Sequence, residues 1–151
     1  MKLTSSGFKD GGMIPERYSR DGRNVSPPLA WDGVPKNTRS LALIVDDPDV
    51  PSGNFVHWLV YNIPADATQL GEGIPAAEKL PNGARQGRND FGEIGYGGPQ
   101  PPRGTYRYLF HLYALDSEIP TPPGAAREQI DDAVSGHRLD ECQLTGKYTR
   151  H

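Results

Sequence analysis

Short apolar runs of strand length, separated by clusters of glycine and proline, constrain the fold of this chain more than any other feature of its sequence. The run SLALIVDD at residues 40–47 stays apolar until it ends in carboxylates, which is typical of a strand covered on both faces. The run HWLVYNIP at residues 57–64 ends at a proline, whose missing N–H cannot continue a central ladder. We therefore predict two buried strands.

A third run, RYLFHLYALD at residues 107–116, alternates with the period of two that a strand imposes. Its even-numbered residues share one face and its odd-numbered residues share the other. Because both sets are mainly apolar or aromatic, we predict that both faces are buried and that the strand lies at the centre of a sheet. The segment 142–148 alternates apolar with polar residues, which predicts a strand with one wet face near a sheet edge.

One segment has the pattern of a helix. Ile130, Ala133, Val134 and His137 recur at helical spacing within PPGAAREQIDDAVSGH, where a proline precedes the start and a glycine near the end can cap the C-terminus. Several strands followed by one or two late helices predict a mainly β, β-rich α+β fold. The chain lacks the regular βαβ alternation of a nucleotide-binding sheet.

The composition is that of a folded chain with many loops. Its 18 glycines and 15 prolines among 151 residues fall just below the roughly 25–30% at which a chain without a repeat is interpreted as disordered. A chain of about this length forms one ordinary domain. We therefore expect a single domain over residues 1–151.

The same sequence disfavours several classes of protein. No window reaches the roughly 18 consecutive apolar residues of a membrane helix, and the first residues lack the apolar stretch of a signal peptide. We expect a cytoplasmic protein with no integral membrane association. The single cysteine, Cys142, excludes an internal disulfide and is expected to be a half-buried strand residue. The net charge of −3 comes from interspersed signs, which disfavours nucleic acid as a partner.

Two segments join a rigid polar loop to a buried strand. Residues 46–64 begin with three like charges close together, on Asp46, Asp47 and Asp49. Their repulsion must be compensated by water, by backbone N–H groups, by a cation or by His57. In residues 95–116, glycines permit close approach of the backbone to a ligand, and prolines restrict the conformational freedom of the loop. Taken separately, each loop also fits a solvated turn or a tight connection.

Together, the two segments resemble the two signature regions of the phosphatidylethanolamine-binding proteins, in particular their Raf-kinase-inhibitor-like branch in bacteria and archaea. The resemblance extends to the opening FKDGGMIPERYSRDGRNVSPPLAWDGVP, to the middle GRNDFGEIGYGGPQPPRGT and to the ending LTGKYTR. It implies a central antiparallel sheet packed with a smaller sheet, flanked by one or two helices near the C-terminus, with an anion pocket at one end. This branch often forms homodimers, so a homodimer is expected.

The resemblance also implies which residues form the pocket. It assigns ligand binding to Asp47, Pro48, Asp49 and His57 in the first segment and to Gly98, Pro101, Pro102, Tyr106 and Tyr108 in the second. At one of these positions the chain departs from the family, which usually has His-Arg-Tyr where this sequence has Tyr106, Arg107 and Tyr108. A tyrosine stays neutral where a histidine can carry a proton, so we expect weaker and less pH-sensitive phosphate binding.

The expected function is non-enzymatic binding of a small anionic group, namely phosphate, phosphoethanolamine or a phospholipid headgroup. The donors would be protonated His57, the Tyr108 hydroxyl and the N–H groups of Gly97 and Gly98. Asp47 or Asp49 would hold His57 protonated or face the ammonium of an ethanolamine group. No catalytic residue, cofactor or metal is expected.

Several alternatives remain. A protein-interaction module that inhibits a kinase or a serine protease is the main one. A hydrolase with Asp47 and Asp49 as acid and base, and a metal site formed by these residues and His57, are minor ones. In a purely structural interpretation, the aspartates cap loop N–H groups and His57 packs beside Leu59 and Tyr61 on one strand face. We expect Arg107 to be an ion-pair partner.

Overall fold

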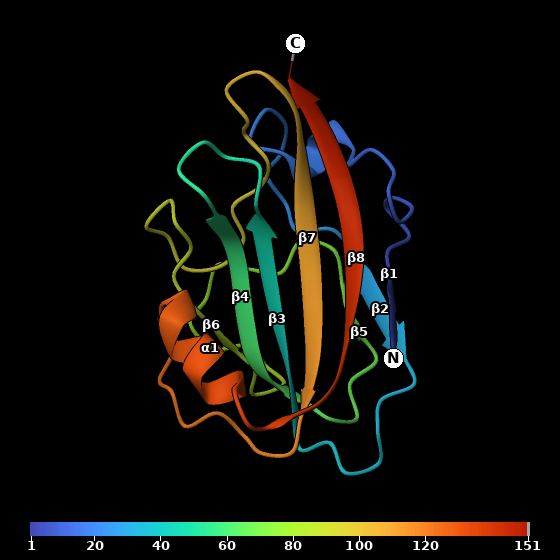
Figure 1. The fold of residues 1–151 in the computed structure, drawn as a ribbon, viewed down its shortest axis with the longest axis vertical. Helices are drawn as coiled ribbons and strands as arrows, with labels where there is room; N and C mark the ends of the chain where they lie inside the picture. Colours follow the sequence, from blue (N-terminus) through green and yellow to red (C-terminus); the bar gives the residue numbers. More distant parts are fainter. Residues whose placement is uncertain (151) are drawn as a thin grey trace.

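Two antiparallel sheets and one α-helix make up the fold over residues 1–150, the part of the chain that the computed structural model describes (Figure 1). The larger sheet has the strand order β6-β4-β3-β7-β8, and the smaller has the order β1-β2-β5. The elements are, in chain order, β1 (Lys2–Thr4), the 3-10 turn η1 (Glu16–Tyr18), β2 (Leu29–Asp32), β3 (Ser40–Asp47), β4 (Phe55–Pro64), β5 (Gln69–Leu70), β6 (Arg85–Gln86), β7 (Gly104–Leu115), α1 (Arg127–Val134) and β8 (Arg138–Arg150).

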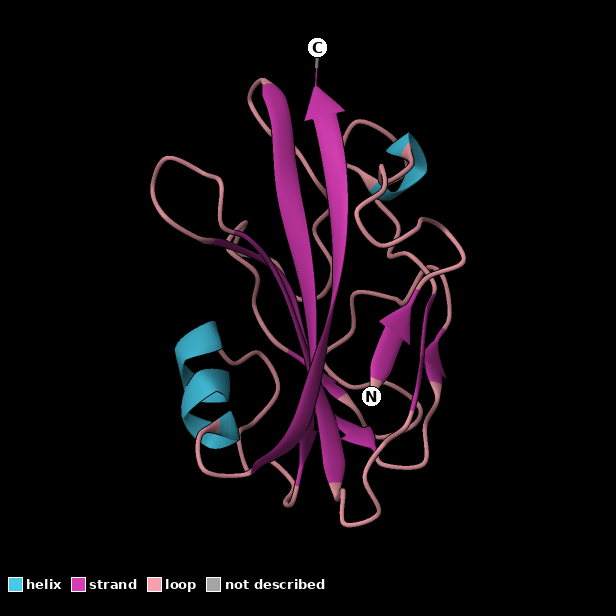
Figure 2. Cartoon of the chain, turned by 45° about the vertical axis from the view of Figure 1, so that its right-hand side comes forward, coloured by secondary structure: helices cyan, strands magenta, loops and turns pink. Residues whose placement is uncertain are grey.

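The larger sheet lies between the smaller sheet and the helix, so the protein has three layers (Figure 2). The main apolar core fills the space between the two sheets, where Leu3 and Trp31 of the smaller sheet belong to the same cluster as Leu43 and Phe110 of the larger one. A second cluster lies on the helix side of the larger sheet and includes Ile130 of α1. Both faces of the central strands are therefore covered.

The central strands confirm the sequence analysis. β3 spans Ser40–Asp47 and is buried at every position, as predicted for a strand covered on both faces. β4 begins at Phe55, two residues before the predicted start, and ends at Pro64 as predicted. Both tryptophans pack in the core, since Trp31 is 5% exposed and Trp58 is fully buried.

The prediction that both faces of the third strand are buried is wrong. The even-numbered face of β7 is buried from Tyr108 to Ala114, but Leu109, His111 and Tyr113 on the other face are half-buried. The reason is the position of α1, which covers β4 and leaves the outer face of β7 with little above it (Figure 1). The central strand of the sheet is β3, and β7 lies between it and the edge strand.

The end of the chain follows the prediction closely. β8 is an edge strand, and Cys142 is half-buried within it. The helix α1 buries Ile130 and Val134, but it stops at Val134, so that His137 lies beyond it. Gly136, with a φ of 82°, adopts the left-handed conformation that ends the helix.

No helix within residues 1–150 combines the length and the apolar character that crossing a membrane requires.

Candidate functional site

A small pocket lies at the end of the larger sheet where β3 ends and where β4 and β7 begin. Its volume is about 140 Å³, and its floor is formed by the buried side chains of Asp47, His57 and Tyr108. Pro101 and Pro102 also line it, so five of the residues assigned by resemblance come together. The lining residues that the sequence analysis missed are Val50, Phe55, Phe91 and Gln100.

A β-bulge directs His57 into this pocket. Val45 pairs with Trp58 and Asp46 pairs with Val56, so His57 has no partner on β3 and leaves the regular alternation of β4. Its ring lies edge-on to the ring of Tyr108, with the centroids 5.1 Å apart. The structural interpretation that placed His57 beside Leu59 on one strand face is therefore wrong, because it assumed a strand without a bulge.

His57 is fastened to the glycine-rich loop by two hydrogen bonds. Its Nδ1 lies 2.6 Å from the carbonyl oxygen of Gly97, and the N–H of Gly97 donates to the carbonyl oxygen of His57 at 2.9 Å. A carbonyl only accepts, so Nδ1 carries the proton and Nε2 of the neutral ring is an acceptor. These bonds join the two loops that the sequence analysis expected to meet.

Burial makes His57 a neutral residue. The ring is 3% exposed, and burial lowers its pKa from 6.5 to about 4, although the hydrogen bond to Gly97 and the charge of Asp90 act in the opposite direction. No carboxylate accepts a hydrogen bond from His57 within residues 1–150. The expectation that Asp47 or Asp49 holds His57 protonated is therefore wrong, since the Gly97 carbonyl orients the ring.

Asp47 is a buried carboxyl group at the last position of β3. It is 2% exposed, and its Oδ1 accepts the backbone N–H of Asp49 at 2.8 Å. Burial raises its pKa from 3.8 to about 6, and the charges of Asp49 and Asp46 add to this effect. Asp47 therefore exchanges a proton at a higher pH than an ordinary aspartate does.

Asp49 does not line the pocket but pairs with Arg107. The guanidinium Nη2 and Nε donate to its carboxylate at 2.8 and 3.0 Å, and the Arg107 backbone N–H donates at 2.9 Å. The hydrogen bond to Arg107 lowers the pKa of Asp49. The prediction that Arg107 is an ion-pair partner is confirmed. Pro48 is half-buried and also lies outside the pocket lining.

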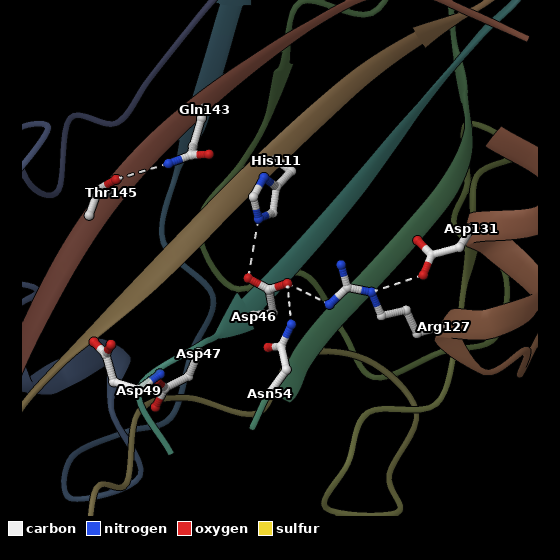
Figure 3. Close-up of polar contacts among 9 residues, drawn as sticks. All are labelled: Asp46, Asp47, Asp49, Asn54, His111, Arg127, Asp131, Gln143 and Thr145. Carbon is white, nitrogen blue, oxygen red and sulfur yellow. Dashed lines mark hydrogen bonds and ion pairs between the residues drawn. The ribbon is translucent and has the colours of Figure 1, made fainter. Parts of the chain in front are cut away.

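Asp46 points to the helix side of the sheet, away from Asp47 and Asp49 (Figure 3). Its carboxylate accepts hydrogen bonds from Arg127 at 2.5 Å and from Asn54 at 3.2 Å, and it lies 3.2 Å from Nε2 of His111. Burial alone would raise its pKa, but His111 and Arg127 hold the pKa below the ordinary value. The compensation expected for Asp46 was water, a backbone N–H group, a cation or His57, and neither Arg127 nor His111 was predicted as its partner.

The two glycine N–H groups predicted as anion donors are already engaged. The N–H of Gly97 bonds to His57, and the N–H of Gly98 donates to Oδ1 of Asn24 at 2.7 Å. A Cβ at Gly98 would come within 2.2 Å of the Tyr18 carbonyl oxygen. Gly98 therefore serves close packing of two backbone segments, and the prediction that these N–H groups face an anion is wrong.

The two tyrosines that the resemblance assigns to the pocket differ in position. Tyr108 is 2% exposed and lines the pocket, where burial raises its pKa and keeps its hydroxyl neutral. Tyr106 is half-buried opposite Tyr148 of β8 and lies outside the lining. The position where the family usually has histidine thus stands beside the pocket, two residues from Tyr108 on the same strand face.

The pocket lining contains no lysine or arginine. Val50, Phe55 and Phe91 give it apolar walls, while the exposed Gln100 and Pro102 stand at its mouth. Within the described part of the chain, no three His, Cys, Asp or Glu side chains come close enough to hold a metal ion.

These features define a two-sheet β protein with a buried aspartate, histidine and tyrosine at one end of its larger sheet. The family model described as phosphatidylethanolamine-binding protein matches residues 4–149. The chain therefore belongs to the phosphatidylethanolamine-binding protein family.

Relatives from distant organisms share almost the whole chain. It is 53% identical to the UPF0098 protein of Methanothermobacter thermautotrophicus, with 99% of each chain covered. It is 40% identical to the UPF0098 protein YbhB of Escherichia coli, with 99% of this chain and 100% of YbhB covered.

Two solved structures have the same fold. The crystal structure of the putative homologue CT736 from Chlamydia trachomatis has a TM-score of 0.91 and 41% identity and covers 99% of this chain and 97% of its own. The structure of Escherichia coli YbcL also has a TM-score of 0.91, with 34% identity and 99% and 98% covered. The mainly β fold with a larger and a smaller sheet, implied by the resemblance, is thus confirmed.

Proposed function

We propose that this protein binds a small anionic group, such as phosphate, phosphoethanolamine or a phospholipid headgroup, in the pocket formed by Asp47, His57 and Tyr108. The observation that carries the proposal is the convergence of three buried polar side chains on a cavity with otherwise apolar walls. Few polar groups in an apolar concave site are what small-molecule binding sites generally share. Membership of a family described as phosphatidylethanolamine-binding supports the same role.

The size of the pocket favours a headgroup-sized ligand. Its volume of about 140 Å³ is smaller than the roughly 300–1,000 Å³ of pockets that enclose a drug-sized molecule. Any larger substituent of the ligand would extend past Gln100 and Pro102 at the mouth. The Tyr108 hydroxyl makes no hydrogen bond within residues 1–150, so it is free to donate to an anionic oxygen.

The arrangement of the carboxylates supports binding without turnover. An acid and base pair for hydrolysis needs both carboxyl groups to flank one bond. Asp47 lines the pocket, whereas Asp49 is held by Arg107 and Asp46 is held by Arg127 on the helix side. The pocket therefore offers one carboxyl group.

The test is a titration of the ¹⁵N-labelled protein with phosphate and with phosphoethanolamine, followed by NMR. We expect saturable shifts at His57, Gly97 and Tyr108, and about 10-fold or more weaker binding for Tyr108→Phe, because a hydrogen bond to a charged group contributes roughly 1.5–3 kcal/mol. Tyr113→Phe, on the outer face of the same strand, is the matched control and should bind like the wild type. The proposal fails if neither anion shifts the pocket residues at millimolar concentration.

A further inference from the structure

The pocket has an unusual hydrogen-bonding pattern for an anion site. No positive side chain lines it, and the neighbouring loop N–H groups of Gly97 and Gly98 are bonded elsewhere. An ionised Asp47 is an acceptor, and so is Nε2 of His57, because Nδ1 donates to Gly97. On the pocket floor only the Tyr108 hydroxyl donates, so an anion entering this pocket meets two acceptors and one donor there.

Charges around the pocket do not change this pattern. Arg107 is engaged with Asp49, and its charge favours the ionised form of Asp47. Asp46 with its partners lies on the other side of the sheet. Asp90 faces the β4 backbone, where it accepts the N–H of Val56 at 2.7 Å, and its charge acts on His57. Arg20 stacks on the Phe91 ring at 4.1 Å and pairs with Glu93 at 3.0 Å.

A ligand complementary to this pattern must carry a donor as well as negative charge. The monoanion of phosphate or of a phosphomonoester has both, because its P–OH can donate to a carboxylate while its charged oxygens accept from Tyr108. Sulfate has the same tetrahedral shape but is a dianion without a proton at neutral pH. Beside an ionised Asp47 it would leave two acceptors facing each other, which is costly in a buried site.

We infer that the pocket, in its proposed role as an anion site, selects oxyanions that carry a proton, and that Asp47 makes this selection by accepting a hydrogen bond from the O–H of the ligand. Asp47 is thus a specificity-determining residue, and the ligand class is a protonated phosphate or phosphomonoester. This narrows the ligands proposed above, because the phosphodiester of a phospholipid headgroup has no P–OH to donate. The inference rests on the proposed function and adds the chemistry by which the site discriminates among anions.

The pH dependence follows from the same geometry. A phosphomonoester loses its second proton near pH 6, and the pKa of Asp47 is raised to about 6, chiefly by burial. Above this range both partners are ionised, so binding must take up a proton and the apparent affinity falls as the pH rises. Below it, a protonated Asp47 can itself donate, so sulfate is no longer excluded.

The experiment compares phosphate with sulfate at pH 5, 7 and 8 by calorimetry and NMR in the wild type, Asp47→Asn and Asp10→Asn. The asparagine at 47 retains the Oδ1 that accepts the Asp49 N–H, and thermal unfolding checks that the variant folds. Asp10→Asn is the matched control, because Asp10 also accepts a backbone N–H, that of Thr145 at 2.8 Å, but is not part of the pocket lining.

At pH 7 we expect the wild type and Asp10→Asn to prefer phosphate at least about 10-fold, as the loss of one buried hydrogen bond would produce. Asp47→Asn should bind sulfate better and phosphate less well, and the preference should fall to about twofold or less. Repeating the phosphate titration at pH 8 in buffers of different ionisation enthalpy should show proton uptake by the wild type and less uptake by Asp47→Asn.

The possible failures are distinguishable. Equal binding of phosphate and sulfate by the wild type at pH 7 overturns the inference and leaves the proposed function standing. A preference for phosphate that persists unchanged in Asp47→Asn also overturns it, because another group would then be making the selection. Absence of phosphate and sulfate binding at all three pH values overturns the inference, and the proposed function itself falls if phosphoethanolamine does not bind either.

Discussion

At the scale of single residues, the three aspartates at positions 46, 47 and 49 show how a fold separates like charges that the sequence crowds together. Asp46 bonds to Arg127 on the helix side, Asp47 is buried on the pocket floor, and Asp49 pairs with Arg107 near the surface. Strand alternation sends the first two to opposite faces, and the turn after β3 swings the third away. The pKa values diverge accordingly, raised for Asp47 and lowered for the other two.

Asp47 and His57 oppose each other in the pH dependence of stability. The pKa of Asp47 is raised from 3.8 to about 6, chiefly by burial. Its contribution to the stability of the fold is therefore fully present below pH 3.8 and is lost as the pH rises through about 6. The pKa of His57 is lowered from 6.5 to about 4, also by burial, so its contribution is present above pH 6.5 and is lost as the pH falls through about 4. In the wild type the two effects largely offset each other.

Single variants should expose the two effects. Between pH 4 and 6.5, the stability of Asp47→Asn relative to the wild type should rise with pH, and the relative stability of His57→Gln should fall. Each change should be roughly 2 kcal/mol over this range, because one unit of pKa shift corresponds to about 1.36 kcal/mol. Urea unfolding at several pH values measures this. Parallel pH profiles of both variants and the wild type would contradict the assigned pKa directions.

Gly98 should tolerate no side chain. A Cβ there would meet the Tyr18 carbonyl oxygen at 2.2 Å, and this backbone atom cannot move aside as a side chain can. We expect Gly98→Ala to lose about 1–3 kcal/mol of stability in urea unfolding, the usual cost of overpacking. Gly71→Ala is the control, because nothing lies within 4 Å of its Cβ position, and it should be close to neutral. Equal stability of both variants would refute the packing role of Gly98.

At the scale of elements, α1 is tied to the sheet by a partly buried ion pair. Nη1 of Arg127 lies 2.5 Å from Asp46, whose side chain is 4% exposed, while Nε of Arg127 makes an exposed contact of 3.2 Å with Asp131 (Figure 3). Removing Arg127 would leave Asp46 buried with only His111 and Asn54 as polar partners. The ion pair with Asp46 should therefore contribute far more to the stability of the fold than the contact with Asp131 within the helix.

We expect Arg127→Met to lose about 2–3 kcal/mol of unfolding free energy, below the full cost of breaking a buried pair because Arg127 is partly exposed. Asp131→Asn should lose no more than about 0.5 kcal/mol. Adding Asp46→Asn to Arg127→Met should recover part of the loss, since no charge then remains unpaired. A double variant less stable than Arg127→Met would argue against this account.

How much of the fold the sequence predicted depends on the length of each element. The long strands β3, β4, β7 and β8 have enough residues for apolar patterns to appear, and all four were predicted. The predicted bounds of β3 and β4 were close, whereas β7 and β8 begin at Gly104 and Arg138, before the predicted starts at 107 and 142. Strands of two to four residues, such as β1, β5 and β6, carry no usable periodicity, so the smaller sheet was expected only from the resemblance. Half-burial of the outer β7 face depends on where α1 packs, which no local pattern specifies.

Of the nine residues that the resemblance assigned to ligand binding, five lie together around one pocket and four lie outside its lining. The residues at 47, 57, 101, 102 and 108 do line one pocket. The charge state of His57 was mispredicted, because it depends on a bulge and on a carbonyl forty residues away in the chain. Phe91 was missed because a single aromatic residue in a loop has no distinguishing pattern.

At the scale of the whole molecule, one apolar core joins both sheets, with Trp31 on the smaller sheet side and Trp58 on the larger. The two sheets should therefore unfold together. Trp31→Phe leaves Trp58 as the only tryptophan, and Trp58→Phe leaves Trp31. In each variant, the fluorescence of the remaining tryptophan should follow the same urea transition as the circular dichroism. Separate midpoints for the two signals would show that the sheets unfold independently.

The reciprocal bonds between His57 and Gly97 have a consequence for how related sites can diversify. They fix the cavity floor through main-chain atoms and one ring nitrogen, so a ligand of the proposed class would meet a preorganised floor and lose little entropy in ordering it. Substitutions at the mouth, at Gln100 or Pro102, would then alter which substituents of a ligand are admitted without disturbing the hydrogen bonds below.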